Sequence, residues 1–378
     1  MSRRARLWLI GGLAFGALLF LYWPLLGQPF IRDDIDIQWT LSRDRSVPER
    51  LVLRDLFSRC MLPHFFRPFG APVFFLFHKA FRLDPAPLRA AILCLSLCGA
   101  YLIGRVSAKL SSNTAVGCFS GGLYALSWIH WSGASMTANL PGGIAQVLFW
   151  LSLHLFLRED AGRGIASILG SLLPVTVALG FKEDVIVFPV FLLVLGRMSR
   201  PLGAVLLAWA GGYLLVRHFL LPNSFLSEAS YFHLDRAALL SWKTYADAVA
   251  LCLEQFRHPV LTRTAWDALA QKAGAAPGRT ALWLATAGLA GYACGGCFRK
   301  VTLEQIRSGR ARVRRGAQLA ALSSAGFFAA VLPYAAFAAI GPWGVHRLSL
   351  AWGASCIGLG AGAYAASRGL VCQGAWAR

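Results

Sequence analysis

Charged residues are scarce in this sequence, and acidic residues are the scarcest of them. Only 14% of the 378 residues are charged, with 17 Asp and Glu against 37 Lys and Arg, while 57% are hydrophobic. A soluble domain normally carries about 25% charged residues, so this composition excludes an ordinary soluble domain. Repeated apolar runs near the length of a bilayer span predict an all-α polytopic membrane protein instead.

The sequence also lacks the patterns of a metal or redox site. Among its nine cysteines, Cys294 and Cys297 have redox-motif spacing, but they end a predicted membrane helix and lack the βα context of that motif. No second Cys/His pair completes a zinc site. We interpret the cysteines as small residues that pack within helices. No internal repeat is visible, and we expect a single membrane domain over residues 1–378.

Ten segments are predicted to span the membrane. They cover residues 7–26, 87–108, 113–130, 141–157, 164–181, 185–196, 201–221, 280–298, 319–340 and 348–366. The first follows a basic start, but its apolar run is too long for a typical signal peptide, so we expect it to be retained.

The distribution of Lys and Arg predicts a cytoplasmic N-terminus. With this orientation the outer loops are 27–86 and 222–278, and a basic cytoplasmic loop covers 299–318. The two predicted sides hold nearly equal numbers of Lys and Arg, but those outside lie mostly in the two long loops, where the positive-inside bias is weak. The richness in Ala, Gly and Arg favours a bacterial inner membrane.

The net charge of +20 is compatible with a nucleic-acid-binding protein, because basic patches bind phosphate backbones. A membrane protein with basic inner loops explains the charge better. We expect the cluster at 299–315 to lie against anionic lipid headgroups and expect no nucleic-acid partner.

Two of the four notable features lie in the first outer loop. Asp33 and Asp34 follow the first span directly, where the simplest alternative is a solvated loop start. The aromatic segment 64–81 contains Pro68 and Pro72 and begins close to Arg67. It is too broken to span, so we predict a re-entrant or interfacial segment; the alternative is a structural lid on the helix bundle.

The other two features lie later in the chain. Lys182, Glu183 and Asp184 separate two apolar stretches with almost no loop. Charges at a membrane edge are costly and usually face a bundle interior or a water-filled cavity, so we favour a functional role over a Lys182–Glu183 pair that locks two helices. His346 and Arg347 stand before the last span, where interfacial anchoring is the alternative.

The order of these features resembles that of polytopic glycosyltransferases of the GT-C fold, similar to protein O-mannosyltransferases and their bacterial relatives. The matching elements are the double acid after the first span, "RP" at 67–68, "KE" at 182–183 and the final "HRLSL" at 346–350. In the last motif only the arginine and the alternating leucines match, and the tyrosines of the family are absent.

The resemblance implies transfer of a sugar from a polyprenyl phosphate in the outer leaflet to an acceptor on the outer face. Asp33 would be the general base, because the acceptor hydroxyl must lose a proton, and Asp34 would support it or bind the acceptor. Lys182 and Arg347 would bind the donor phosphate, whose developing charge needs fixed cations. Secondary candidates for that role are His346 and Arg67, and Glu183 would support Lys182.

Such an enzyme needs no cofactor besides its lipid-phosphate donor, although a divalent metal is left open. The acceptor can be a glycan, a lipid or a protein. Two other classes compete with the enzyme. A transporter or flippase would place its charges near the bilayer midplane and often shows repeated halves. A non-catalytic membrane scaffold would keep the fold without the chemistry.

Overall fold

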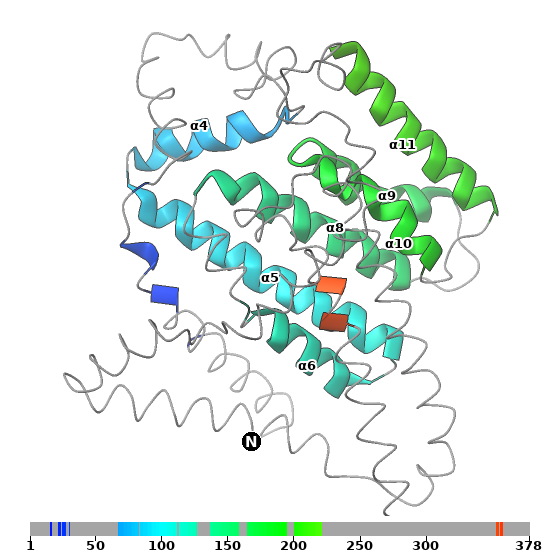
Figure 1. Ribbon diagram of the computed structural model, residues 1–378, viewed down its shortest axis with the longest axis horizontal. Coiled ribbons are helices and arrows are strands. Elements are labelled where there is room, and N and C mark those ends of the chain that lie inside the picture. The colour runs from blue at the N-terminus through cyan, green and yellow to red at the C-terminus, as the bar shows by residue number, and fades with distance from the viewer. Residues whose placement is uncertain are drawn as a thin grey trace, which may run out of the picture.

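The structure is a computed structural model that describes mainly residues 67–220. The described ranges are 67–82, 84–111, 113–125, 137–158, 165–194 and 200–220, with residue 127 and a few residues within 16–30 and 353–357. Throughout these ranges the regular elements are helices and no strand occurs (Figure 1). The described chain is therefore all-α, as the composition predicts.

The helices lie close to the predicted spans. In chain order they are α4 (Gly70–Phe81), α5 (Pro85–Ser111), α6 (Thr114–Ala125), the 3-10 turn η1 (Thr137–Asn139), α8 (Leu140–Arg158), α9 (Ile165–Leu179), the 3-10 turn η2 (Glu183–Val187), α10 (Phe188–Val194) and α11 (Arg200–Leu220). Two boundaries differ from the prediction. Within the described part of the third predicted span the helix covers Thr114–Ala125, and the sixth divides into a 3-10 turn and the short helix α10.

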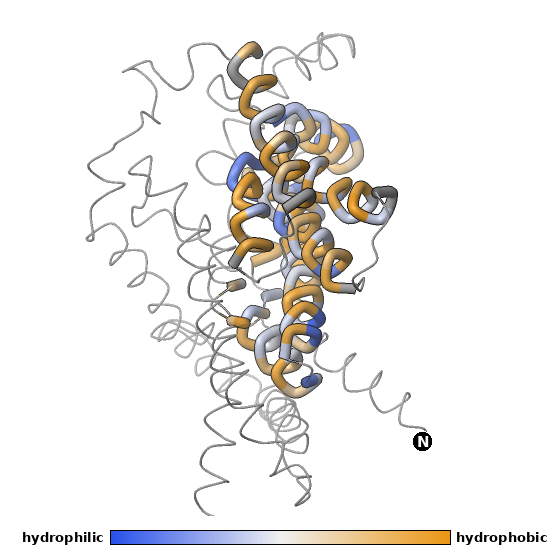
Figure 2. Tube along the Cα trace, turned by 90° about the vertical axis from the view of Figure 1, so that its right-hand side faces the viewer, coloured by the Kyte–Doolittle hydropathy of each residue, from blue (hydrophilic) through white to orange (hydrophobic). Residues whose placement is uncertain are grey.

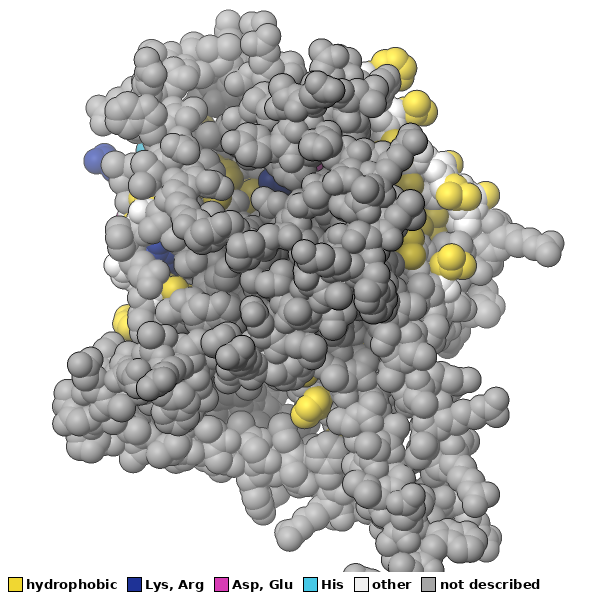
Figure 3. Space-filling view, in the orientation of Figure 1, with side chains coloured by type: hydrophobic (Ala, Val, Ile, Leu, Met, Phe, Trp, Pro, Cys, Tyr) yellow, Lys and Arg dark blue, Asp and Glu magenta, His cyan; other side chains and the backbone are white. Residues whose placement is uncertain are grey.

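Two helices are long and apolar enough to cross a membrane. They are Pro85–Ser111 and the continuous stretch Thr137–Leu157. The tube in Figure 2 is hydrophobic along most of its described length. Large apolar side chains also point outward from α11, where Leu207 is 73% and Phe219 77% exposed, and Figure 3 shows hydrophobic side chains gathered on that side. Exposed apolar surface of this kind suits lipid contact better than contact with water.

Glycines allow α5 and α6 to approach each other closely. A Cβ atom at Gly117 would lie 2.5 Å from the carbonyl oxygen of Gly104, and one at Gly121 would lie 2.8 Å from that of Ala100. Small residues four apart are typical of packed membrane helices, because they let two backbones meet. At this contact the hydroxyls of Ser107 and Ser120 form a buried hydrogen bond of 2.9 Å.

Aromatic packing forms the centre of the bundle. The buried rings of Phe149 and Trp150 on α8 meet Phe191 of α10 edge to face. A polar contact joins α8 to α9 next to Pro174, which lies inside α9. There the backbone N–H of Val175 donates to the Ser152 hydroxyl at 2.9 Å. A neighbouring hydroxyl can stabilise the backbone where a proline interrupts a membrane helix.

Contacts at the helix ends show that α5 and α6 run in opposite directions, whereas α5 and α8 run in the same direction. At the start of α5, the buried Arg89 side chain donates to the carbonyl of Leu25 at 3.2 Å. The Tyr22 hydroxyl donates to the carbonyl of Ala125, at the end of α6, at 3.0 Å. At the opposite end of α5, Lys109 donates to the carbonyl of His154 at 3.3 Å. These contacts therefore join helix ends that lie on the same side of the membrane if consecutive predicted spans cross it in alternating directions.

The predicted non-spanning segment 64–81 contains a short helix, α4. Its 12 residues reach about 18 Å, less than the hydrocarbon thickness of about 30 Å. Pro72 is compatible with the helix because it lies in the first turn, where the backbone N–H has no intrahelical partner. Phe74 packs with Leu88 and Leu140, so α4 covers the first turns of α5 and α8. Its exposed residues include Leu76 and Lys79.

Candidate functional site

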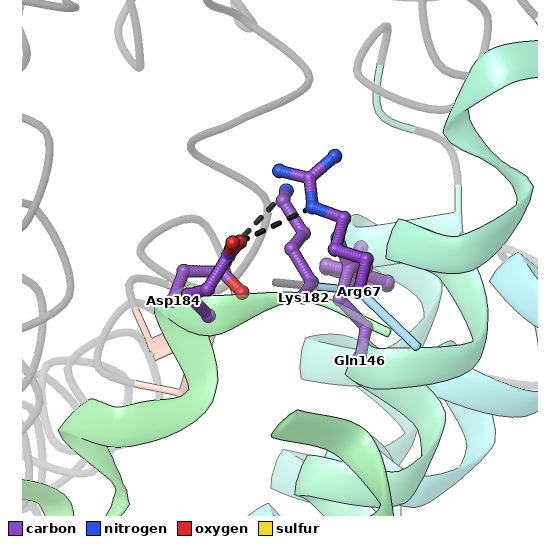
Figure 4. A network of polar contacts seen from close by, with 6 residues as sticks. Arg67, Gln146, Lys182 and Asp184 are labelled. Atoms are coloured by element: carbon purple, nitrogen blue, oxygen red, sulfur yellow. Dashed lines mark hydrogen bonds and ion pairs between the residues drawn. The ribbon is translucent and has the colours of Figure 1, made fainter. Parts of the chain in front are cut away.

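Two ion pairs meet where the start of α4 approaches the end of α9. The Arg67 Nε lies 3.1 Å from a carboxylate oxygen of Glu183, and the Lys182 Nζ lies 3.1 Å from one of Asp184. In Figure 4 dashed lines join the Arg67 and Lys182 side chains to the carboxylates. Residues 116 positions apart in the sequence thus form one charged cluster, defined here as Arg67, Lys182, Glu183 and Asp184.

A tight backbone contact brings Arg67 to this cluster. The N–H of Phe69 donates to the carbonyl of Gly180 at 3.0 Å. The Phe69 ring covers Gly180 so closely that a Cβ there would lie 2.2 Å from a ring carbon, and the ring also packs on Phe181 at 5.5 Å. Gly180 has no side chain, which allows this approach. Arg67 is held two residues from the contact.

The end of α9 places the three consecutive charges. The N–H groups of Phe181 and Lys182 both donate to the carbonyl of Ala178, at 2.9 Å each, and so satisfy the last turn of the helix. Lys182 is then extended, with φ −158° and ψ 133°, and Glu183 and Asp184 begin η2. Acidic residues are favourable in the first turn of a helix, where the backbone N–H groups point at them.

The cluster is partly buried, so its charges need each other. The Arg67 and Glu183 side chains are 25% and 16% exposed, and those of Lys182 and Asp184 only 13% and 5%. Removing a charge from water costs several kcal/mol, about what a well-placed partner restores. Each carboxylate therefore compensates a cation that would otherwise be costly at this position.

Helix α8 forms one wall of the cluster. The Lys182 side chain lies over Gly142, where a Cβ would be 3.5 Å from the Lys182 Cδ. One turn further along α8 is Gln146, which accepts a 2.9 Å hydrogen bond from the buried Tyr124 hydroxyl. Figure 4 places Gln146 beside the base of the Arg67 and Lys182 side chains. The sequence analysis did not identify Gln146 and Tyr124. The one signal for them in the sequence was that each is a polar residue within a predicted span.

The structure brings together three of the predicted site residues: Arg67, Lys182 and Glu183. It also corrects the alternative in which Lys182 pairs with Glu183. Lys182 pairs with Asp184, and Glu183 pairs with Arg67. The other predicted site residues lie outside the described residues; they are Asp33, Asp34, His346 and Arg347. The outer loop 222–278, the basic loop 299–318 and the cysteine pair 294–297 also lie outside them.

Chemically, the cluster offers two cations for an anionic group and two carboxylates that could hold a cation or a proton. Within the described ranges, no group of three or more His, Cys, Asp and Glu side chains is arranged to hold a metal ion. The guanidinium of Arg67 suits a phosphate because its planar donors match two phosphate oxygens.

No protein-family model, curated protein or solved structure matches this chain.

Proposed function

We propose that this chain is a multi-pass membrane glycosyltransferase of the GT-C type with ten spans. It transfers a sugar from a polyprenyl phosphate to an acceptor on the outer face of a bacterial inner membrane. In this proposal the N-terminus is cytoplasmic, and the start of α4 and the end of α9 face outward. The acceptor is a glycan, a lipid or a protein.

The observation that carries the proposal is the charged cluster at one end of an apolar helix bundle. Ionisable groups at such a position are costly and mark functional sites by default. There Arg67 lies 3.1 Å from Glu183, and Lys182 lies 3.1 Å from Asp184. A lipid-borne phosphate stays at the membrane edge, because its chain is apolar and its head is charged. Cations at the bundle end suit that position, whereas a transporter would carry its charges near the midplane.

In the proposed reaction Asp33 and Asp34 act on the acceptor, and the cations act on the leaving phosphate. Asp33 accepts the proton of the acceptor hydroxyl as that oxygen attacks the anomeric carbon of the sugar. The bond from this carbon to the phosphate oxygen breaks, and the polyprenyl phosphate leaves with the bonding electrons. Lys182, Arg67, Arg347 and His346 stabilise the charge on the leaving phosphate. Asp34 holds the acceptor, and Glu183 supports the cations.

The test is sugar transfer by the purified full-length chain with labelled polyprenyl-phosphate sugars. Asp33→Asn keeps the side-chain shape but cannot accept a proton, so transfer should fall about 10²- to 10⁴-fold, the usual contribution of a positioned base. Donor binding should change little, because its contacts lie on the cations. Asp34→Asn should lower transfer less than Asp33→Asn or should weaken acceptor binding instead.

Wild-type-like transfer by Asp33→Asn would remove the base assignment. Absence of transfer from every labelled donor, combined with transport of the lipid across vesicles, would favour a flippase.

A further inference from the structure

Helix α4 has two sides of different character. Its inner side packs on the first turns of α5 and α8 through the buried Phe74. Leu76 and Lys79, one turn apart on the outer side, are exposed, and so are Phe81 and Arg82 at the end of the helix. The exposed fractions of the two apolar residues are large, 61% for Leu76 and 44% for Phe81. Exposed apolar and basic side chains together are typical of a helix that lies in the plane of a membrane surface.

The position of α4 in the bundle fits the level of the lipid headgroups. The apolar cluster that holds Phe74 also contains Tyr22 and Leu25, from the end of the first predicted span. Between them in the sequence, Trp23 is 67% exposed. Tryptophan is enriched at both membrane–water interfaces, where one end of its ring meets lipid and the other meets water. The end of the bundle that carries α4 therefore also carries an interfacial aromatic residue.

The basic residues of α4 have a simpler explanation, which is the helix dipole. His78 and Lys79 lie in the last turn, where cations are favourable to any helix. The Lys79 Nζ also lies over the Phe75 ring, 5.7 Å from its centroid. These contacts stabilise α4 but do not account for its exposed apolar side chains.

Arg82 supplies an independent observation. It ends α4 with φ 55° and ψ −122°, while its backbone N–H donates to the carbonyl of His78 at 2.7 Å. Glycine adopts such angles more readily than any residue with a side chain. Within the described ranges, no other non-glycine residue has a positive φ. Strained residues of this kind cluster at functional sites, so the arginine side chain is present at a position where the backbone favours glycine.

We propose that the outer side of α4 binds anionic phospholipids at the bilayer surface. Lys79 and Arg82 contact the lipid phosphates, and Leu76 and Phe81 lie among the upper carbons of the acyl chains. The long stems of lysine and arginine allow this arrangement, because they keep the charged group at the headgroups while the stem lies along apolar surface. The surface is separate from the charged cluster, and the proposal does not depend on sugar transfer.

Charge complementarity selects an anionic lipid as the partner. Helix α4 contains no acidic residue. The first acidic residue after it, Asp84, is engaged at the start of α5, where its carboxylate accepts a hydrogen bond from the backbone N–H of Ala86 at 2.9 Å. Water would leave the apolar side chains without a matching partner, and a neutral lipid surface would not attract the cations.

The experiment follows α4 in the full chain with a fluorescent probe. In a cysteine-free background, Leu76→Cys carries an environment-sensitive fluorophore, and the protein is placed in phosphatidylcholine nanodiscs with increasing fractions of phosphatidylglycerol. We expect the emission to shift to the blue as that fraction rises. Nitroxide groups on the acyl chains should quench the probe more than iodide in the water does. Added salt should weaken the response, because it screens charges at the surface.

Removing the cations should raise the phosphatidylglycerol fraction that gives half of the maximal shift. Lys79→Gln and Arg82→Gln should each raise it about fivefold, which corresponds to about 1 kcal/mol per basic residue near an anionic surface. Arg82→Gly should weaken the lipid response equally. It should nevertheless raise the unfolding temperature in neutral detergent, because glycine relieves the strain of the positive φ. This variant separates lipid binding from a loss of stability.

The matched control removes an exposed arginine elsewhere. Arg105 lies on α5, 5.9 Å from the centroid of the Tyr101 ring, and Arg105→Gln should leave the response of the α4 probe unchanged. If the basic residues of α4 served the helix dipole alone, Lys79→Gln would lower the unfolding temperature without changing the lipid response.

That result would overturn the proposal, as would an unchanged response in the double variant Lys79→Gln with Arg82→Gln. An equal loss with Arg105→Gln, or stronger quenching by iodide than by the lipid nitroxides, would also overturn it. A shift produced by farnesyl phosphate at a tenfold lower fraction than phosphatidylglycerol would instead identify a polyprenyl phosphate as the occupant. None of these results depends on sugar transfer, so this proposal and the proposed function can fail separately.

Discussion

At the residue scale, the charged cluster depends on one glycine as much as on its charges. Gly180 lies under the Phe69 ring and accepts the hydrogen bond that holds the start of α4. Its role is to be small, because a methyl group there would occupy the space of the ring. The acidic and basic side chains supply the chemistry, and Gly180 permits them to meet.

Gly180→Ala should therefore destabilise the protein by about 1–3 kcal/mol, the usual cost of overpacking. The added Cβ would lie 2.2 Å from a Phe69 ring carbon, so the ring must leave Phe181 and the Arg67 contact must shift. Thermal unfolding in detergent measures the change. The control is Gly170→Ala on α9, the helix that precedes Gly180, where nothing lies within 4 Å of the new Cβ. It should be neutral or stabilising by about 0.5–1 kcal/mol, and equal destabilisation by both variants would contradict the packing argument.

The ion pairs make a second prediction at this scale. Lys182→Met should destabilise the protein by about 3–5 kcal/mol, because it leaves the carboxylate of Asp184 buried without its cation. Adding Asp184→Asn should restore much of that loss, whereas adding Glu183→Gln should not, since Glu183 pairs with Arg67. Denaturant or thermal midpoints of the single and double variants complete the cycle. Rescue by Glu183→Gln instead would indicate that Lys182 pairs with its neighbour.

At the scale of elements, α5 and α6 are held by close backbone contact more than by side-chain bulk. The approach is closest at Gly104 and Gly117, and Ser107 and Ser120 form a hydrogen bond one turn away. In lipid there is little hydrophobic force between helices, so such packing and hydrogen bonds supply the association.

Gly117→Ala should loosen this helix pair. The new Cβ would lie 2.5 Å from the Gly104 carbonyl oxygen, and because that atom belongs to the backbone, the helices must separate. We expect a loss of about 1–3 kcal/mol, measured as a lower unfolding temperature. Gly122→Ala provides the control within α6, because nothing lies within 4 Å of its Cβ. An unchanged unfolding temperature for Gly117→Ala would show that the helices are not in close contact.

At the scale of the whole molecule, the described helices place α4 and the charged cluster at one end of the bundle (Figure 1). The start of α6 lies at the other end, beside the end of α5. The orientation inferred from Lys and Arg assigns the α4 end to the outer side.

Cysteine labelling tests this arrangement. In a cysteine-free background, Ala80→Cys on α4 should react with an impermeant maleimide added to whole cells. Thr114→Cys at the start of α6 should react only after permeabilisation, and both positions are exposed in the structure. Cysteines beside Asp33 and Arg347 should behave like Ala80→Cys, and one at Ser308 like Thr114→Cys. Labelling of positions 80 and 114 from the same side would contradict the alternating helices, and a complete reversal would contradict the outward-facing site.

Much of the helical layout follows from the sequence, but the pairing within the site does not. The apolar runs at 87–108, 141–157, 164–181 and 201–221 correspond to α5, α8, α9 and α11, because length and hydropathy depend only on local composition. The short α10 differs from its predicted span, since the charges at 182–184 begin a 3-10 turn and not a continuous helix.

The sequence by itself determined the helical character of the described residues and pointed to the charged residues at 182–184, because hydropathy and the cost of charges between apolar stretches are properties of single segments. Only the tertiary structure decided which charges meet. Arg67 joins Glu183 and leaves Lys182 to Asp184 because Phe69 and Gly180, which are far apart in the sequence, lie in contact. That contact depends on shape and packing between distant segments, which no local pattern records.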